Sequence, residues 1–366
     1  MKATLKTIFL ILTVTLFGLS IWFFAKQNYI IAGPVLTAAW LLLALTMLQS
    51  ERFKKFAYTT FIFAAVTVAM AFPDFFGHVG KFQLKNTISP LLQLITFGVG
   101  CTMGWRDLAG VVKMPKAVLI GVVCHYAIMP LVGFTIANVF GFPPGIAAGV
   151  VLVGCMPSGL ASNVMAFIAK ANLALSVTIT AVSTLLSPLM TPLLMKILGG
   201  QFVPVSFSAM FLDIIELVIA PIFAGVLFNY LFHKYVKWIN IIMPKVSMAG
   251  ITCIIIIITA AGRNNLLHVG IALVIADLLH MTTGVFLGYW SGRLLKLSEN
   301  NSRTIAIEVG MQNSGLASGI AVKMGQIATI GLAPAVNGPI MNTTFSLIAT
   351  WWGNRPTEVE SRESEV

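Results

Sequence analysis

The sequence predicts an all-α polytopic membrane protein in which two inverted five-helix repeats each contain one broken helix, preceded by an extra N-terminal two-helix hairpin. Two observations lead to this prediction. First, 58% of the 366 residues are hydrophobic and only 10% are charged, whereas soluble domains carry about 25% charged residues. Second, one polar, glycine-rich motif occurs twice, each time inside a long apolar segment.

The two copies of the motif read VGCMPSGLAS at residues 153–162 and VGMQNSGLAS at residues 309–318, with seven of ten positions identical. A helix in lipid must satisfy its own backbone, so an interruption is tolerated only where the helix faces protein or a wet cavity. A matched pair of interrupted segments points to the binding site of a transporter built from repeats. Close helix packing would explain the glycines and serines, but not the polar residues Glu308, Gln312 and Asn313.

Twelve apolar segments are long enough to span a membrane, since a spanning helix needs about 20 residues. In chain order they are residues 5–25, 30–49, 57–76, 88–105, 116–140, 144–169, 172–198, 206–232, 240–262, 266–292, 303–324 and 327–352. The motif lies in the sixth and the eleventh segment. This odd step of five makes the two copies cross the membrane in opposite senses, which predicts an inverted repeat.

Four parts of the chain follow from this spacing. The inverted repeats cover residues 57–200 and 206–352, each with about five helices. Residues 1–50 remain as an extra N-terminal transmembrane hairpin, which we interpret as a peripheral packing element or an oligomerisation element. Residues 353–366 form a polar, acidic tail that we expect to be cytoplasmic and disordered.

The net charge of +11 is interpreted as a signal of orientation, not of binding to nucleic acid, because the basic residues fall in short loops. With the N-terminus inside, sixteen of the 23 lysines and arginines fall on the inner side and six on the outer side, and Lys245 lies within a segment. Basic residues concentrate in cytoplasmic loops. We therefore expect a multi-pass protein of the cell inner membrane with both termini in the cytoplasm.

Glu308 is the acidic residue deep in the second motif, and it dominates the expected chemistry. A carboxylate in hydrocarbon is costly when ionised and unpaired, so it should hold a proton or a cation. Arg303 lies near the inner end of the same segment, and no other lysine or arginine is close in sequence until Lys323. Sodium is a hard cation that prefers several oxygen ligands, which a broken helix supplies through its free carbonyl groups.

Other classes of protein fit the pattern less well. No HExxH or GxSxG motif occurs in the chain, so we do not expect an enzyme. One inverted pair of broken helices suits alternating access better than the repeated filter loops of a channel. Asp277 and His280 lie within the tenth segment, where we expect Asp277 to pair with a neighbouring hydroxyl group or with His280.

Residues 149–192 and 304–318 resemble the two signature regions of the bile acid:sodium symporter family, and the resemblance extends over about residues 57–352. It implies a ten-helix fold with a core domain that contains the two broken helices, a panel domain, and a substrate cavity between them. It also implies sodium-coupled symport of an organic anion. The N-terminal hairpin departs from the usual ten-helix pattern.

The resemblance implies two sites for the sodium ion (Na+). The first would use Ser162, Asn163, Ser176, Thr180 and Glu308. The second would use Glu308, Gln312, carbonyl groups near Val309 and Met311, and a glutamine whose position is occupied here by His125.

The substitution of His125 for this glutamine leaves several readings open. An imidazole nitrogen is a poorer ligand for sodium than an amide oxygen, so His125 coordinates weakly or the second sodium ion is lost. Alternatively, His125 titrates and couples a proton, because an unperturbed histidine has a pKa near 6.5. A structural role, with the ring donating to a carbonyl group, is equally compatible with the sequence.

The substrate is expected to be an organic anion, because the two half-helices restart where the motifs are polar. Helix N-termini present unpaired N–H groups and a positive dipole end, which together attract anions. A bile acid-like, keto acid or pantoate-like carboxylate fits this design. The expected substrate-binding residues are Pro157, Ser158, Gly159, Asn163, Asn313, Ser314, Gly315 and Met341.

Two alternatives stay open at this point, namely a proton-coupled organic anion carrier and a sodium/proton exchanger. The expected partners are a small organic anion, the sodium ion and the lipid bilayer, and the sequence does not define an oligomeric state.

Overall fold

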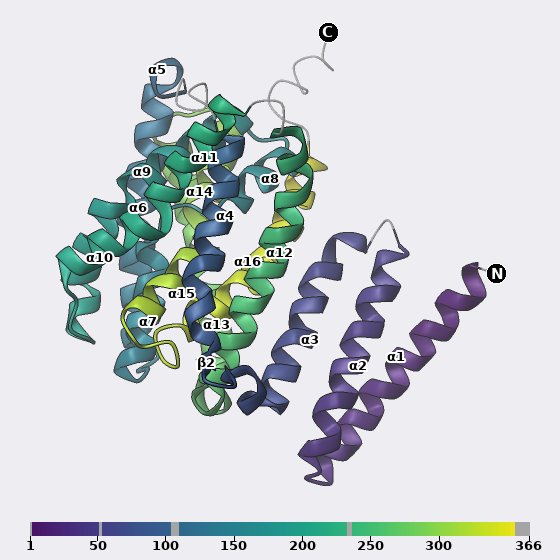
Figure 1. Ribbon diagram of the computed structural model, residues 1–366. Helices are drawn as coiled ribbons and strands as arrows, with labels where there is room; N and C mark the ends of the chain where they lie inside the picture. Colours follow the sequence, from purple (N-terminus) through teal and green to yellow (C-terminus); the bar gives the residue numbers. More distant parts are fainter. Residues whose placement is uncertain (1, 51–52, 104–109, 233–235, 356–366) are drawn as a thin grey trace.

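The computed structural model describes residues 2–50, 53–103, 110–232 and 236–355, and helices account for nearly all of its regular structure (Figure 1). Its α-helices are α1 (Lys2–Ala25), α2 (Tyr29–Leu48), α3 (Ala57–Ala71), α4 (Ile88–Thr102), α5 (Gly110–Lys113), α6 (Pro115–Val139), α7 (Pro144–Cys155), α8 (Ala161–Ile168), α9 (Leu173–Ile197), α10 (Phe207–Ile214), α11 (Ala220–Leu231), α12 (Val236–Ala261), α13 (Arg263–Leu294), α14 (Glu299–Gly310), α15 (Ser314–Lys323) and α16 (Leu332–Gly353). The shorter elements are the 3-10 turns η1 (Lys54–Phe56), η2 (Pro73–Phe76), η3 (Leu84–Thr87) and η5 (Gly199–Gln201), the π-helical turn η6 (Ile215–Ile219), and a hairpin of β1 (His78–Val79) and β2 (Phe82–Gln83).

The described part of the chain contains seven helices that are long and apolar enough to cross a membrane. They cover Ile8–Ala25, Ile30–Leu48, Pro115–Val139, Leu173–Gln201, Phe207–Leu231, Ile241–Ala261 and Arg263–Leu294. Two shorter apolar helices are Ala57–Ala71 and Pro144–Cys155. The protein is therefore an all-α membrane protein, as predicted. Each of the twelve expected segments contains a helix, but several of these helices are too short or too polar to count as spans on their own.

The first three helices lie at one edge of the molecule. Figure 1 shows α1, α2 and α3 side by side, with α1 outermost and α3 next to α12. The α1 helix exposes large apolar side chains along its length, among them Ile11, Val14 and Ile21. This surface suits contact with lipid, because the hydrocarbon region offers no partner for polar groups.

Both predicted interruptions are present. The first separates α7 from α8 between Cys155 and Ala161, and the second separates α14 from α15 between Gly310 and Ser314. The two breaks pair through their backbones, because Gly159 N donates to Met311 O at 3.1 Å and Asn313 N donates to Pro157 O at 3.0 Å. The inverted relationship between the two halves of the chain stays a prediction.

Gly159 is required by this close approach of two backbones. A Cβ atom at this position would lie 2.7 Å from the carbonyl oxygen of Gln312. That oxygen belongs to the backbone of the second break and cannot move aside as a flexible side chain could. The glycine of the first motif therefore has a steric reason that its sequence context alone does not reveal.

A π-helical turn inside one of the long helices was not expected. The segment predicted over 206–232 divides into α10 and α11 at the π-helical turn η6. Two side chains of α4 use the carbonyl groups of this turn: Thr96 Oγ1 donates to Leu217 O at 3.0 Å, and Gln93 Nε2 donates to Glu216 O at 3.3 Å. Single π-helical turns inside α-helices are frequent at functional sites, and this one borders the cavities described below.

Glycines let α13 and α14 pack at close range. A Cβ atom on Gly284 would lie 3.2 Å from the Cα atom of Gly310, and one on Gly288 would lie 3.1 Å from the Cα atom of Ala306. Small residues allow such backbone proximity between helices in a membrane. This packing holds α14, and with it Glu308, firmly against α13.

Candidate functional site

The carboxylate of Glu308 lies at the centre of the site and is fully buried, with 0% of the residue exposed. Three hydroxyl groups donate to it. Ser158 Oγ reaches Oε2 at 2.6 Å, Thr180 Oγ1 reaches the same oxygen at 2.8 Å, and Ser176 Oγ donates to Oε1. In the described part of the chain no lysine or arginine forms an ion pair with Glu308, and Arg303 pairs with Glu299 instead.

The residues expected to form the first sodium site lie together around this carboxylate. Asn163 Oδ1 lies 2.8 Å from Ser176 Oγ and 3.4 Å from Thr180 Oγ1, while the hydroxyl groups of Ser162 and Thr180 are 3.3 Å apart. The oxygens come from α8, α9 and α14. An amide oxygen, three hydroxyl groups and a carboxylate are the kinds of ligand that a hard cation prefers.

His125 on α6 connects the two breaks. Its Nδ1 atom lies 2.9 Å from the carbonyl oxygen of Glu308, and its Nε2 atom lies 2.8 Å from that of Met156. The ring is fully buried. Both nitrogens therefore face backbone oxygens from α14 and from the end of α7, so neither is directed at an open coordination position.

The other residues of the second expected sodium site are partly engaged. Gln312 Nε2 donates to Val309 O at 2.9 Å, and Met311 O accepts from Gly159 N. Gln312 Oε1 is buried and has no hydrogen-bond partner. Of this second set, one amide oxygen is thus left without a partner, whereas His125 and the two carbonyl groups already have partners.

Two cavities lie beside the crossing. The larger, about 210 Å³, is lined by both asparagines that the sequence predicts to contact the substrate, Asn163 and Asn313. The smaller, about 130 Å³, is lined by four of the other expected residues, which are Gly159, Ser314, Gly315 and Met341. Leu160 and Asn313 line both cavities. The two spaces therefore lie on adjacent sides of the same crossing.

Pro157 and Ser158, also expected to bind substrate, line neither of these cavities. Ser158 is fully buried and its hydroxyl group is directed at Glu308. The backbone N–H groups of Gly159 and Asn313 are paired across the crossing, and Leu316 N donates to Asn313 Oδ1 at 3.0 Å. The expectation that these half-helix ends present unpaired N–H groups is wrong at these three positions, because the opposite break and the capping asparagine satisfy them.

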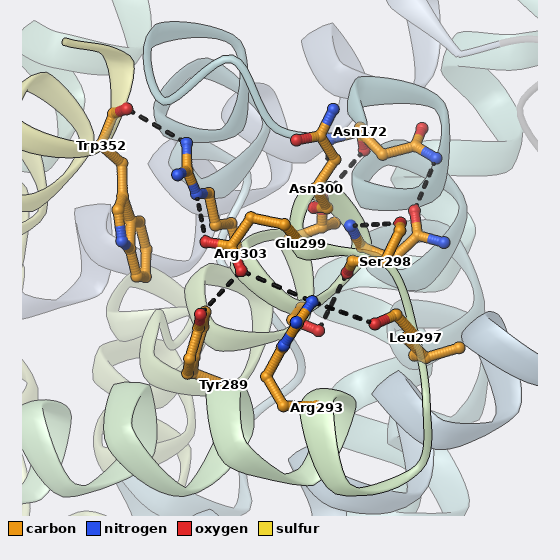
Figure 2. Close-up of polar contacts among 12 residues, drawn as sticks. Asn172, Tyr289, Arg293, Leu297, Ser298, Glu299, Asn300, Arg303 and Trp352 are labelled. Carbon is orange, nitrogen blue, oxygen red and sulfur yellow. Dashed lines mark hydrogen bonds and ion pairs between the residues drawn. The ribbon is translucent and has the colours of Figure 1, made fainter. Parts of the chain in front are cut away.

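A polar cluster lies at the start of α14 and includes Arg303 (Figure 2). Arg303 was expected near the inner end of its segment. Arg303 Nε donates to Glu299 Oε1 at 2.8 Å, and its Nη1 donates to Trp352 O at 3.1 Å. Tyr289 donates to Glu299 Oε2 at 2.7 Å, and Arg293 lies 3.6 Å from the same oxygen. These contacts connect α13, α14 and the end of α16.

The charges of this cluster change the pKa of Glu299, a residue that precedes the predicted span 303–324. Burial raises the pKa of Glu299, but the hydrogen bonds from Tyr289 and Arg303 and the positive charges of Arg303 and Arg293 outweigh it. The pKa therefore lies below its ordinary value of 4.5. An opposite charge at short range favours the ionised form of a carboxyl group.

Asn172 aligns α9 with α14, and thereby brings the hydroxyl groups of α9 to Glu308. Its backbone N–H donates to Thr304 Oγ1 and its Nδ2 donates to Asn301 Oδ1, both at 2.9 Å (Figure 2). Its Oδ1 caps α9 by accepting from Leu175 N at 3.1 Å. Asparagine is a preferred residue at this capping position.

Several contributors to the site were missed by the sequence reasoning. Ser158 was assigned to substrate instead of Glu308, and Ser183, whose Oγ accepts from Ser158 N at 3.3 Å, was not singled out. Asp277 bonds to the amide of Asn337, not to a hydroxyl group or to His280, whose Nε2 lies 2.9 Å from Met129 O. The sequence feature that could have revealed these residues is their polarity within apolar segments. It does not reveal their partners, because the partners depend on the packing of distant helices.

The chain is similar to known transport proteins. The model of a family described as the Sodium Bile acid symporter family matches residues 89–269, a range that includes α8 and α9 but ends before Glu308. An uncharacterized sodium-dependent transporter, YocS, from Bacillus subtilis (strain 168) is 38% identical over 309 residues, which cover 83% of this chain and 94% of that protein. A probable sodium/metabolite cotransporter, BASS1, chloroplastic, from Arabidopsis thaliana is 34% identical over 270 residues, which cover 74% of this chain and 67% of that protein.

Proposed function

The chain belongs to the sodium bile acid symporter family, and on that premise we propose that it is a secondary active transporter that couples a small organic anion to sodium. The relatives named as a sodium-dependent transporter and as a probable sodium/metabolite cotransporter support sodium coupling. The substrate that we propose is a carboxylate of the bile acid-like, keto acid or pantoate-like kind.

One observation supports the sodium site above all others: a fully buried carboxylate that is surrounded by oxygen atoms and has no basic partner among the described residues. Ser162, Asn163, Ser176 and Thr180 place their oxygens around Glu308. A buried charge is costly unless it is paired. A sodium ion at this position would neutralise the carboxylate and take over the hydrogen-bonding role of the hydroxyl groups.

We propose a single sodium ion per transport cycle. Both nitrogens of His125 face backbone carbonyl groups, so this position supplies no oxygen ligand. The second site would keep the Gln312 oxygen and the carbonyl groups of Val309 and Met311, but its carboxylate, Glu308, is shared with the first site. A hard cation prefers several oxygen ligands, so the missing oxygen leaves the second position less suited to sodium in this chain.

The substrate anion is proposed to bind at the crossing, in the cavities lined by Asn163 and Asn313. Because the N–H groups of Gly159 and Asn313 are already paired, recognition relies on the asparagine side chains and on the positive dipole end of α15. Sodium on Glu308 and an anion in the adjacent cavity would attract each other. This attraction is the physical basis for their coupling.

Transport is proposed to proceed by alternating access between two inverted repeats, residues 57–200 and 206–352, with both termini on the cytoplasmic side. The ion pair of Lys323 Nζ with Glu216 Oε2, at 2.8 Å, joins the end of α15 to the π-helical turn. Movement of the interrupted helices past α10 and α11 would break this contact. Coupling then requires only that sodium favour the state that binds the anion, by a few kcal/mol.

The sodium site is tested by thermal unfolding of the purified protein in sodium and in potassium at equal ionic strength. A ligand present at a hundred times its Kd stabilises the folded state by about 2.7 kcal/mol. We expect sodium to raise the Tm of the wild type and not that of Glu308→Gln. The matched control is Glu216→Gln, the same change at an exposed carboxylate, which should keep the sodium effect. Equal curves in both salts would contradict the proposal and would favour a proton-coupled carrier or exchanger.

A further inference from the structure

Asp277 is a buried carboxylate in the middle of α13 that the sodium site does not use. Only 7% of the residue is exposed, and α13 is one of the helices long and apolar enough to span a membrane. Its Oδ1 atom accepts a hydrogen bond from Asn337 Nδ2 at 2.6 Å. Its Oδ2 atom is buried and has no hydrogen-bond partner.

The other titratable side chains around α13 are engaged elsewhere. On α13 itself, His280 faces Met129 O. On α6, His125 faces Glu308 O and Met156 O, and Tyr126 donates to Ser183 O. On α14, Glu308 accepts from hydroxyl groups of the first half, and Glu299 and Arg303 pair with each other.

Among the described side chains, the remaining helices against α13 offer Asp277 no counter-charge either. The α16 helix contains no acidic or basic residue, and Lys245 of α12 is exposed. Within the described residues no cationic side chain forms an ion pair with Asp277. The carboxylate would thus be an uncompensated charge at membrane depth if it were ionised, which is costly.

The surroundings suit a proton better than a metal ion. The described residues contain no group of three or more His, Cys, Asp or Glu side chains that could hold a metal. The group that touches Asp277 is the NH₂ of Asn337, which presents hydrogens and would repel a cation. A proton on Oδ2 neutralises the carboxyl group without needing further oxygen ligands.

Two hydrogen bonds connect Asp277 to the second interrupted helix. An ionised carboxylate can only accept, so the amide of Asn337 must direct its NH₂ at Asp277 and its oxygen at Ser314. Ser314 Oγ donates to that oxygen at 2.5 Å. Ser314 is the first residue of α15 and lines the smaller cavity at the crossing.

We infer that Asp277 is a proton-binding site linked to the anion site through Asn337 and Ser314. The carboxylate takes up one proton from water to become a carboxylic acid and releases it again, with no other change in bonding. With Asp277 ionised, a negative charge lies two hydrogen bonds behind the position proposed for the substrate anion. With Asp277 protonated this repulsion is absent, so proton uptake favours binding of the anion.

The inference rests on the proposed function for its link to the anion but not for the binding of the proton. Linked sites typically change each other's affinity by about 5- to 150-fold. The sodium effect on Tm arises at Glu308 and should survive Asp277→Asn. If sodium does not raise the Tm but the proton site is present, only the proposed function is refuted. If sodium raises the Tm but the proton site is absent, only this inference is refuted.

The test uses infrared difference spectroscopy of the purified full-length chain, with the proton itself as the probe. A protonated carboxyl group absorbs at a frequency separate from that of a carboxylate. We expect a carboxylic acid band that appears and disappears with pH, is absent in Asp277→Asn, and persists in Glu308→Gln. A band that is lost only in Glu308→Gln, a band from Asp277 that does not change with pH, or no band at all would overturn the inference.

A second variant keeps the test decisive if Asp277→Asn does not fold. Asn337→Ser removes the amide donor to Asp277, so the band of this carboxylic acid should shift in frequency. The control is Asn342→Ser, the same change five residues along α16, at a residue that lines the smaller cavity but makes no hydrogen bond with Asp277. An unshifted band in Asn337→Ser would assign the signal to another carboxyl group and refute the proposed connection.

Discussion

Ser158 donates its hydroxyl hydrogen to Glu308 across 2.6 Å, although the two residues are 150 positions apart in the chain. The first belongs to the break between α7 and α8, and the second to the last turn of α14 before the other break. Each interrupted helix therefore completes the environment of the other. A sodium ion at Glu308 would act on both breaks at once.

Ser158→Ala should weaken sodium binding and destabilise the protein. Removing one partner of a buried hydrogen bond costs about 1–3 kcal/mol, and Glu308 loses one of three hydroxyl donors. Thermal unfolding in sodium and potassium measures both effects. The control is Ser208→Ala, at an exposed serine of α10, which should leave the Tm and its sodium dependence unchanged. An unaltered sodium effect in Ser158→Ala would show that this hydroxyl group has no part in the site.

Gly159→Ala should abolish the crossing. The new Cβ atom would lie 2.7 Å from Gln312 O, and the pairing of the two backbones leaves it no room. We expect a Tm well below that of the wild type and no sodium effect. Gly270→Ala is the matched control, because a Cβ at that helical position would meet no atom within 4 Å beyond its chain neighbours and the backbone of its own helix. Alanine is favoured over glycine in a helix by about 1 kcal/mol, so this control should keep or raise the Tm. Equal stability of the two variants would contradict the close approach.

His125→Gln should create the missing second sodium site. The new amide oxygen would add to the unpartnered Oε1 of Gln312. The wild type, for which we propose one sodium ion per monovalent anion, is expected to be electroneutral, whereas two sodium ions would move one net charge worth about 2.3 kcal/mol per 100 mV. Voltage-clamped proteoliposomes report the difference.

The control for this change is His280→Gln, at another buried histidine that faces Met129 O and not Glu308. It should remain electroneutral. If the wild type already responds to voltage with two sodium ions per cycle, the loss of the second site is refuted.

Glu299→Gln should remove part of the acid sensitivity of the protein. The pKa of Glu299 is lowered in the folded state, so its ion pairs contribute stability above the ordinary pKa of 4.5 and this contribution is lost as the pH falls through the lowered value. In a series of Tm against pH, the variant should therefore be less stable at neutral pH and show a flatter decline in acid. A decline as steep as that of the wild type would place the acid sensitivity in other groups. The control Glu216→Gln removes a more exposed ion pair, with Lys323, and should therefore change both features less than Glu299→Gln does.

Much of this architecture can be predicted from the chain. Apolar segment length predicted a helix in each of twelve segments, and the paired motifs predicted both breaks, because lipid imposes strict rules on composition. The family resemblance implied that Ser162, Asn163, Ser176 and Thr180 share a site with Glu308. In the structure these four side chains lie around its carboxylate. The π-helical turn Ile215–Ile219 carries no comparable signal, since its carbonyl groups are used by side chains of α4, more than a hundred residues away.

The sequence by itself determined which apolar segments form helices, where two of them break, and which carboxylate lies between the breaks, because these features depend on local composition. Only the tertiary structure decided where each polar atom finds its partner. The N–H groups of the breaks pair with each other, the ring of His125 faces a carbonyl oxygen 183 residues away, and Asp277 reaches Ser314 through Asn337. Such choices depend on hydrogen-bond geometry between distant helices, which no local pattern encodes.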